Sequence, residues 1–227
     1  GKCLHVGHMC VAPDFLVVTE NPNVALIKWF FVQFDTFFQS SPESSDSYAR
    51  IINEKHLQRL SQSLQDATSR GAEILYGGNF DAETRFFEPT LLEGVPEDAR
   101  LLEEEIFGPI LPVITVESME AAVDFVNARA KPLALYVFAD DDAQAEQLLG
   151  ATSSGGACVN HVILHITPAE LPFGGVGASG MGRYHGQAGF DAFSNLRSVM
   201  KKPTRPDPKL LYPPYTSLKE KLIRRFV

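Results

Sequence analysis

Short apolar runs alternate with segments of helical periodicity over most of this chain. Leu57, Leu60 and Leu64 recur at helical spacing, whereas 73–76 and 133–138 read as strands. Strands that alternate with helices are typical of parallel pairing, since each helix carries the chain back across the sheet. We therefore predict an α/β fold with a mostly parallel sheet.

The length and the charge limit the classes of protein to consider. The chain has 227 residues, of which 44% are hydrophobic, which suits one large domain with appendages. The formal net charge is −8. An acidic chain is repelled by phosphate backbones and anionic lipid, so we expect no nucleic-acid partner and at most weak membrane contact.

Two segments stand out from the alternating pattern. In 24–38, aromatic side chains recur at roughly helical spacing, which predicts a helix that is buried almost all round or pressed against a partner; they are Trp29, Phe30, Phe34, Phe37 and Phe38. That segment is too short and too interrupted by polar residues to span a bilayer. From residue 203 the chain is rich in proline and then basic. We predict a C-terminal arm at 203–227, which follows a domain at 1–202 with flanking sheet and oligomerisation elements.

Cysteine and glycine spacing exclude several alternatives. The three cysteines show no paired spacing, and the N-terminus has no apolar signal region, so we expect a reducing, cytoplasmic location. Two histidine pairs lie near cysteines, but neither has a specific zinc motif, so no metal site is predicted. The Gly175–Gly180 run matches G-x-G-x-x-G without the strand and helix of a dinucleotide fingerprint. We predict tight turns with positive φ there instead.

Cys10 is the candidate nucleophile. It follows a turn that contains Gly7 and precedes Val11-Ala-Pro-Asp14. A reactive thiol needs exposure and nearby donors for a developing oxyanion, and free backbone N–H groups at a loop junction supply such donors.

Several blocks around Cys10 are more specific together than alone. Gly7-His-Met-Cys-Val-Ala-Pro-Asp14 is one, Glu104-Glu-Ile-Phe-Gly-Pro109 is another, and the Gly-rich segment 171–186 is the most specific. The others are 48–53, 131–136, 153–156 and 212–214. In order and spacing these blocks resemble the aldehyde dehydrogenase family, in particular its class 3 branch, over nearly the whole chain.

The resemblance implies an oxidoreductase that converts aldehydes to carboxylic acids. It makes Cys10 the nucleophile that forms a thiohemiacetal and then a thioester. It implies NAD or NADP as cofactor, with Glu105 holding the nicotinamide ribose and Phe107 beside that ribose and ring. The substrate expected is a medium-chain aliphatic or aromatic aldehyde. The expected assembly is a homodimer or a pair with a full-length homologue.

The chain departs from the family pattern in two places. His5 stands at the position of the family's oxyanion-binding asparagine, and His8 and Met9 also differ from the pattern. Only nine residues precede Cys10. We therefore expect the Rossmann-like cofactor domain and the general-base glutamate to be absent from this chain. The alternative hypothesis is a truncated, catalytically dead fragment that acts as an interaction or dimerisation module.

Overall fold

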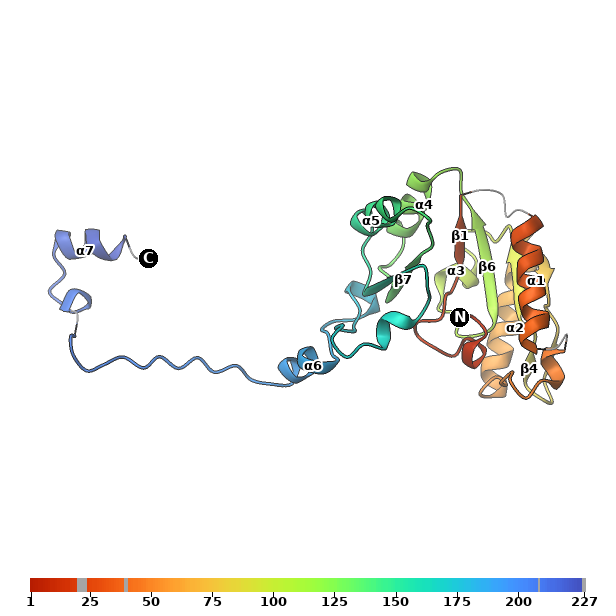
Figure 1. The fold of residues 1–227 in the computed structure, drawn as a ribbon, viewed down its shortest axis with the longest axis horizontal. Coiled ribbons are helices and arrows are strands. Elements are labelled where there is room, and N and C mark those ends of the chain that lie inside the picture. Colours follow the sequence, from red (N-terminus) through yellow and green to blue (C-terminus); the bar gives the residue numbers. More distant parts are fainter. Residues whose placement is uncertain (20–23, 39–40, 208, 226–227) are drawn as a thin grey trace. The chain divides into compact units, whose positions relative to one another are not determined.

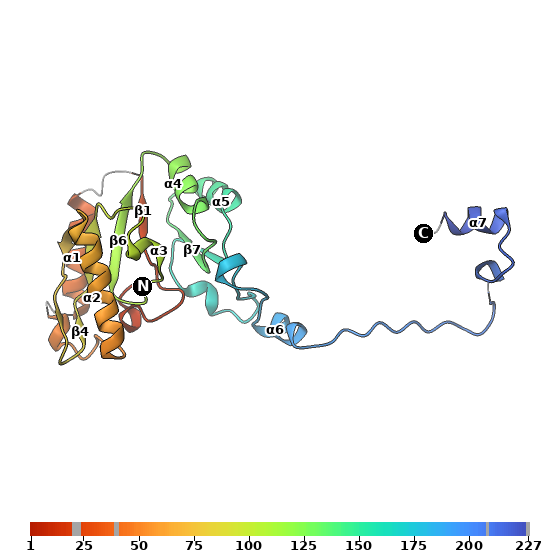
Figure 2. The same ribbon diagram turned by 180° about the vertical axis from the view of Figure 1, so that it is seen from behind.

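The computed structural model describes residues 1–19, 24–38, 41–207 and 209–225. By contacts it divides into two compact units, Gly1–Phe193 and Ser194–Val227. The catalytic domain expected at 1–202 and the arm expected at 203–227 stay predictions, because compactness does not define a catalytic domain. Both units are drawn in Figures 1 and 2.

The strands of the first unit are short and mostly parallel. Their bounds are β1 Leu16–Val18, β2 Glu73–Tyr76, β3 Phe80–Asp81, β4 Phe86–Phe87, β5 Thr90–Glu93, β6 Ile110–Thr115, β7 Ala134–Val137 and β8 Gly156–Val159. Four of them form one sheet in the order β1-β6-β5-β2, with β2 alone antiparallel to its neighbour. Strands β7 and β8 form a second, parallel pair, and β3 and β4 form a small hairpin. The predicted α/β fold with a mostly parallel sheet is confirmed.

Helices are present where the spacing of 24–38 and of Leu57, Leu60 and Leu64 predicts them. Their bounds are α1 Val24–Phe38, α2 Glu54–Ser69, α3 Arg100–Glu103, α4 Met119–Asn127, α5 Asp142–Ala151, α6 Gly186–Ala192 and, in the second unit, α7 Ser217–Ile223. Side chains cap several of their N-termini, as Asn53 does for α2 and Ser118 for α4. No helix among the described residues is long and apolar enough to cross a membrane.

Helices α1 and α2 cover opposite faces of the four-stranded sheet (Figures 1 and 2). On the α2 side, Leu60 packs with Leu92 and Ile110 in the larger core. On the other side, Ile27 and Phe30 of α1 pack on a smaller cluster, built around the buried side chains of Leu91, Leu111 and Val113. Alternate residues of each strand thus face different helices, as the two-residue period of a strand requires.

Helix α1 corrects one expectation. Its inner side chains are covered, and Phe38 is only 6% exposed, but Trp29 is 59% and Phe37 60% exposed. The prediction that this helix is buried almost all round within the chain is therefore wrong. The helix forms the outer layer on its side of the sheet (Figures 1 and 2), which agrees with the exposure of these two side chains. Contact of that face with a partner stays a prediction.

The Gly-rich segment turns tightly, as predicted. Gly177 and Gly180 have φ of +63° and +145°. A Cβ on Gly175 would lie 2.0 Å from the Ser179 carbonyl oxygen. Glycine is needed here because the backbone approaches itself closely and takes left-handed conformations.

Candidate active site

Two segments that precede parallel strands form the site. β1 pairs with β6 in the register Leu16↔Val113, so the chain that enters β1 lies beside the chain that enters β6. The first segment, residues 7–14, is called the thiol loop here and carries Cys10. The second, residues 104–109, is called the Phe107 segment. The parallel pairing therefore brings together two blocks that are about 95 residues apart in the sequence.

The two segments touch at three points. A Cβ on Gly7 would lie 2.3 Å from the Gly108 carbonyl oxygen, so the backbones meet without room for a side chain. The His8 and Phe107 rings stack with their centroids 5.8 Å apart. At the far end of the loop, the Ile106 N–H donates to an Asp14 carboxylate oxygen at 3.3 Å. These contacts fix the thiol loop against the Phe107 segment.

Cys10 lies in a turn and is exposed, as a reactive thiol must be. The turn is closed by the Ala12 N–H, which donates to the Met9 carbonyl at 3.0 Å. Cys10 and Val11 are its two central residues. Among the described residues nothing accepts a hydrogen bond from their N–H groups, so both donors are unpaired.

The Phe107 segment is held in an uncommon conformation. Phe107 has φ of +50°, which costs a non-glycine residue about 1–2 kcal/mol. His56 of α2 compensates, because its Nε2–H donates to the Phe107 carbonyl at 2.6 Å. Arg59 donates to the other nitrogen of His56 at 3.3 Å and also to the Glu105 and Ile106 carbonyls. Backbone strain of this kind is concentrated at functional sites.

Charged groups surround Glu105. Lys2 is only 8% exposed and pairs with Asp14 at 3.3 Å. Partial burial raises the pKa of Glu105, with a further contribution from the negative charge of Asp14, while Lys2 and Arg59 oppose the shift. Burial lowers the pKa of Lys2, and Asp14 opposes that shift most. The exposed Glu105 carboxylate thus lies beside an ion pair of which Lys2 is buried and Asp14 half-buried.

The environment of His8 favours the uncharged form of its ring. Burial lowers its pKa, and the nearby His56, Arg59 and His5 lower it further. Its Nε2 is buried and has no hydrogen-bond partner among the described residues. The ring therefore acts as a flat apolar contact between Phe107 and His56, whose ring centroid is 5.2 Å away.

The structure brings Cys10, Glu105 and Phe107 into one region, and their roles stay predictions. Our sequence reasoning missed three groups that hold them: His56, Asp14 and Tyr136. Tyr136 of β7 donates its hydroxyl to the Val11 carbonyl at 2.6 Å. A block match at 131–136 was the available signal for Tyr136, but it gave no role. No sequence pattern pointed to His56, because its hydrogen-bond partner is a backbone oxygen 51 residues away.

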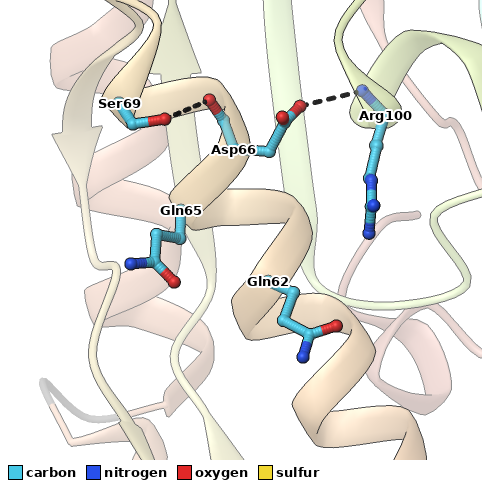
Figure 3. A pocket seen from close by; sticks show the side chains of 5 residues that line it. All are labelled: Gln62, Gln65, Asp66, Ser69 and Arg100. Carbon is cyan, nitrogen blue, oxygen red and sulfur yellow. Dashed lines mark hydrogen bonds between the residues drawn. The ribbon is translucent and has the colours of Figure 1, made fainter.

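Other candidate sites do not form among the described residues. No group of three histidine, cysteine or acidic side chains there is placed to hold a metal ion. A shallow pocket lies on α2 (Figure 3) and is lined by Gln62, Gln65, Asp66, Ser69 and Arg100. None of these residues belongs to the thiol loop or to the Phe107 segment. Within the pocket an Asp66 carboxylate oxygen accepts from the Arg100 N–H at 3.2 Å, which ties α2 to α3.

Comparison with known proteins supports one family. Residues 1–199 match the Aldehyde dehydrogenase family. A 4,4'-diaponeurosporen-aldehyde dehydrogenase of Staphylococcus aureus is 41% identical over all of this chain and 48% of its own length. A bovine (Bos taurus) dimeric NADP-preferring aldehyde dehydrogenase is 40% identical over 89% of this chain and 83% of its own sequence. A rat (Rattus norvegicus) aldehyde dehydrogenase family 3 member A2 is 39% identical over 96% of this chain and 45% of its own.

Solved structures agree with the sequence matches. Staphylococcus aureus AldH in a substrate-bound state superposes with a TM-score of 0.90 at 40% identity, over 99% of this chain and 48% of that one. An NAD-dependent aldehyde dehydrogenase from Sinorhizobium meliloti superposes with a TM-score of 0.80 at 29% identity, over 92% of this chain and 41% of that one. The chain thus spans about half the length of most of these relatives.

Proposed function

The chain belongs to the aldehyde dehydrogenase family, and we propose that it is the thiol-bearing part of an NAD(P)-dependent enzyme that oxidises aldehydes to carboxylic acids. The observation that carries the proposal is the packing of an exposed Cys10 turn against the Phe107 segment. That arrangement puts a thiol and unpaired N–H groups on one segment and an exposed carboxylate on the segment packed against it.

The proposed chemistry uses these groups in three steps. The Cys10 thiolate attacks the carbonyl carbon of the aldehyde and forms a thiohemiacetal, whose oxygen accepts from N–H groups of the turn. Loss of hydride from the former aldehyde carbon leaves a thioester on Cys10. Water then cleaves the thioester, which releases the carboxylic acid and restores the thiol.

The cofactor would bind beside the Phe107 segment. NAD or NADP supplies the oxidised nicotinamide that accepts the hydride. Glu105 fits the role of a ribose partner, because its exposed carboxylate accepts hydrogen bonds from hydroxyl groups. Phe107 fits the role of a ring contact, since its side chain is half-buried and held by the stacked His8 ring. His5 is exposed before the turn and is the candidate for the missing oxyanion donor.

The substrate and the assembly are part of the proposal. We expect medium-chain aliphatic or aromatic aldehydes. One relative at 41% identity is named as a probable coniferyl aldehyde dehydrogenase, and that name supports an aromatic substrate. We also expect a homodimer or a pair with a full-length homologue, which the exposed apolar side chains of α1 and the dimeric bovine relative support. The expected location is cytoplasmic with at most weak membrane contact.

The first prediction concerns Cys10. Purified chain with NAD⁺ or NADP⁺ and an aromatic aldehyde should produce reduced nicotinamide, measured by its absorbance. Cys10→Ser should lower that rate by about a thousandfold or more, because the nucleophile is lost. The matched control is Cys158→Ser, which changes a half-buried thiol on β8 and should leave the rate unchanged.

The alternative function predicts a different result. A catalytically dead interaction module would give no absorbance change with either cofactor, yet would pair with itself or with a full-length homologue in sedimentation experiments. Turnover that disappears in Cys10→Ser excludes that alternative. Turnover that survives in Cys10→Ser contradicts the nucleophile assignment.

A further inference from the structure

Tyr136 connects the second strand pair to the thiol loop. It lies on β7, and its hydroxyl donates to the Val11 carbonyl at 2.6 Å across 125 residues of sequence. Val11 directly follows Cys10. The bond therefore joins the β7–β8 pair to the turn that presents the thiol.

The bonded carbonyl belongs to the peptide unit that closes the turn. The Val11 carbonyl accepts from Tyr136, and the N–H of the same peptide unit, on Ala12, donates to Met9 at 3.0 Å. Both polar ends of the unit are thus fixed. Because a peptide unit is planar, this also fixes the direction of the chain on either side of Cys10 and Val11.

The Tyr136 side chain is itself held in place. His165 packs on it with the ring centroids 5.8 Å apart, and the His165 ring fills the space above Gly156, where a Cβ would lie 2.8 Å from the imidazole Cδ2. The backbone of Ile163 lies next to the Tyr136 hydroxyl, and this β-branched residue is held at a φ of +71°. Burial raises the pKa of Tyr136 to about 12, so the hydroxyl keeps its proton and remains a donor at neutral pH.

We propose that Tyr136 is a positioning residue for Cys10: its hydrogen bond to the Val11 carbonyl sets the orientation of the thiol and of the N–H groups in the Met9–Ala12 turn, and His165 supports the Tyr136 ring. The effect of Tyr136 on the rate of aldehyde turnover rests on the proposed function. Its effect on the conformation of the turn does not, because that effect concerns only hydrogen bonds within this chain.

The test compares Tyr136→Phe with Tyr184→Phe in the full chain. Tyr136→Phe removes the hydroxyl and keeps the ring. Tyr184→Phe removes a hydroxyl that has no hydrogen-bond partner among the described residues. Tyr136→Phe should speed amide exchange at Ala12 by roughly three- to tenfold, the factor for one net hydrogen bond. It should lower kcat by a similar factor with KM for the aldehyde unchanged, while Tyr184→Phe changes neither.

Each outcome decides the proposal. Unchanged exchange at Ala12 overturns it, whether or not the chain turns over aldehyde. If Tyr136→Phe speeds exchange at Ala12 but leaves kcat unchanged, the hydrogen bond stabilises the turn without affecting turnover, and the positioning role is overturned. A wild-type chain without turnover contradicts the proposed function alone, and exchange at Ala12 still decides whether Tyr136 holds the turn. His165→Ala gives a second variant, which should accelerate the same amide if the ring support is real.

Discussion

Gly7 shows how one residue sets the distance between the two halves of the site. Its φ is +76°, and a Cβ there would lie 2.3 Å from the Gly108 carbonyl oxygen. A side chain at this position would separate the thiol loop from the Phe107 segment. The close approach therefore depends on glycine for both conformation and space.

Gly7→Ala should destabilise the fold by about 2–5 kcal/mol, since left-handed strain and overpacking add. The matched control is Gly71→Ala, where φ is +106° but nothing lies within 4 Å of the added Cβ. That variant carries strain alone and should lose about 1–2 kcal/mol. Urea unfolding of both variants measures the difference. Equal losses would show that the contact with Gly108 does not matter.

At this scale the sequence predicts residue types better than their partners. Cys10, Glu105 and Phe107 were candidates from motif blocks, and the structure brings them into one region. The groups that hold them were not predictable, because they act through backbone atoms. His56 binds the Phe107 carbonyl and Tyr136 binds the Val11 carbonyl. Every residue has a carbonyl, so no sequence pattern marks which one a side chain will meet.

Helix α1 shows what can be predicted for an element. Its bounds, 24–38, follow from aromatic periodicity alone, because local spacing decides whether a segment is helical. Its exposure does not follow, because that depends on the layers that other elements supply. The strand from Leu16 to Val18 illustrates the same limit: its residues are all apolar, but its parallel pairing with β6 depends on residues nearly 100 positions away.

Two adjacent residues test the packing of α1. Phe38 is 6% exposed and packs edge-to-face on Tyr48, with ring centroids 5.0 Å apart, whereas Phe37 is 60% exposed. Phe38→Ala should cost about 3–5 kcal/mol of unfolding free energy, because it leaves a cavity in the core. Phe37→Ala should change it by only about 0.5 kcal/mol, as surface substitutions do. Chemical denaturation compares the two, and a large loss in Phe37→Ala would mean that its face is covered in solution.

Over the whole molecule, charged residues are distributed unevenly along the chain, although the net charge is only −8. Residues 194–227 contain nine of the 20 basic but two of the 28 acidic residues, which gives that stretch +7 and leaves −15 for residues 1–193. The argument from net charge against anionic surfaces therefore applies to the first unit only. The second unit carries its positive charge beside the exposed Leu218 and Leu222, which is the composition that favours weak contact with anionic lipid.

The pH dependence of stability reflects three half-buried histidine rings of the first unit. Burial lowers the pKa of His8, His56 and His165 below the ordinary value of 6.5. Below pH 6.5 the unfolded chain binds protons that the folded chain does not, so stability is fully present above that pH and is lost as the pH falls towards the folded-state values. The denaturation midpoint should therefore drop as the pH is lowered from 7.5 to 5.5.

His8→Gln should reduce this drop, because one histidine with a lowered pKa is gone. His161→Gln changes an exposed ring and should leave the drop unchanged. A midpoint that stays constant over this range would mean that the imidazoles are as accessible to protons in the folded chain as in the unfolded one.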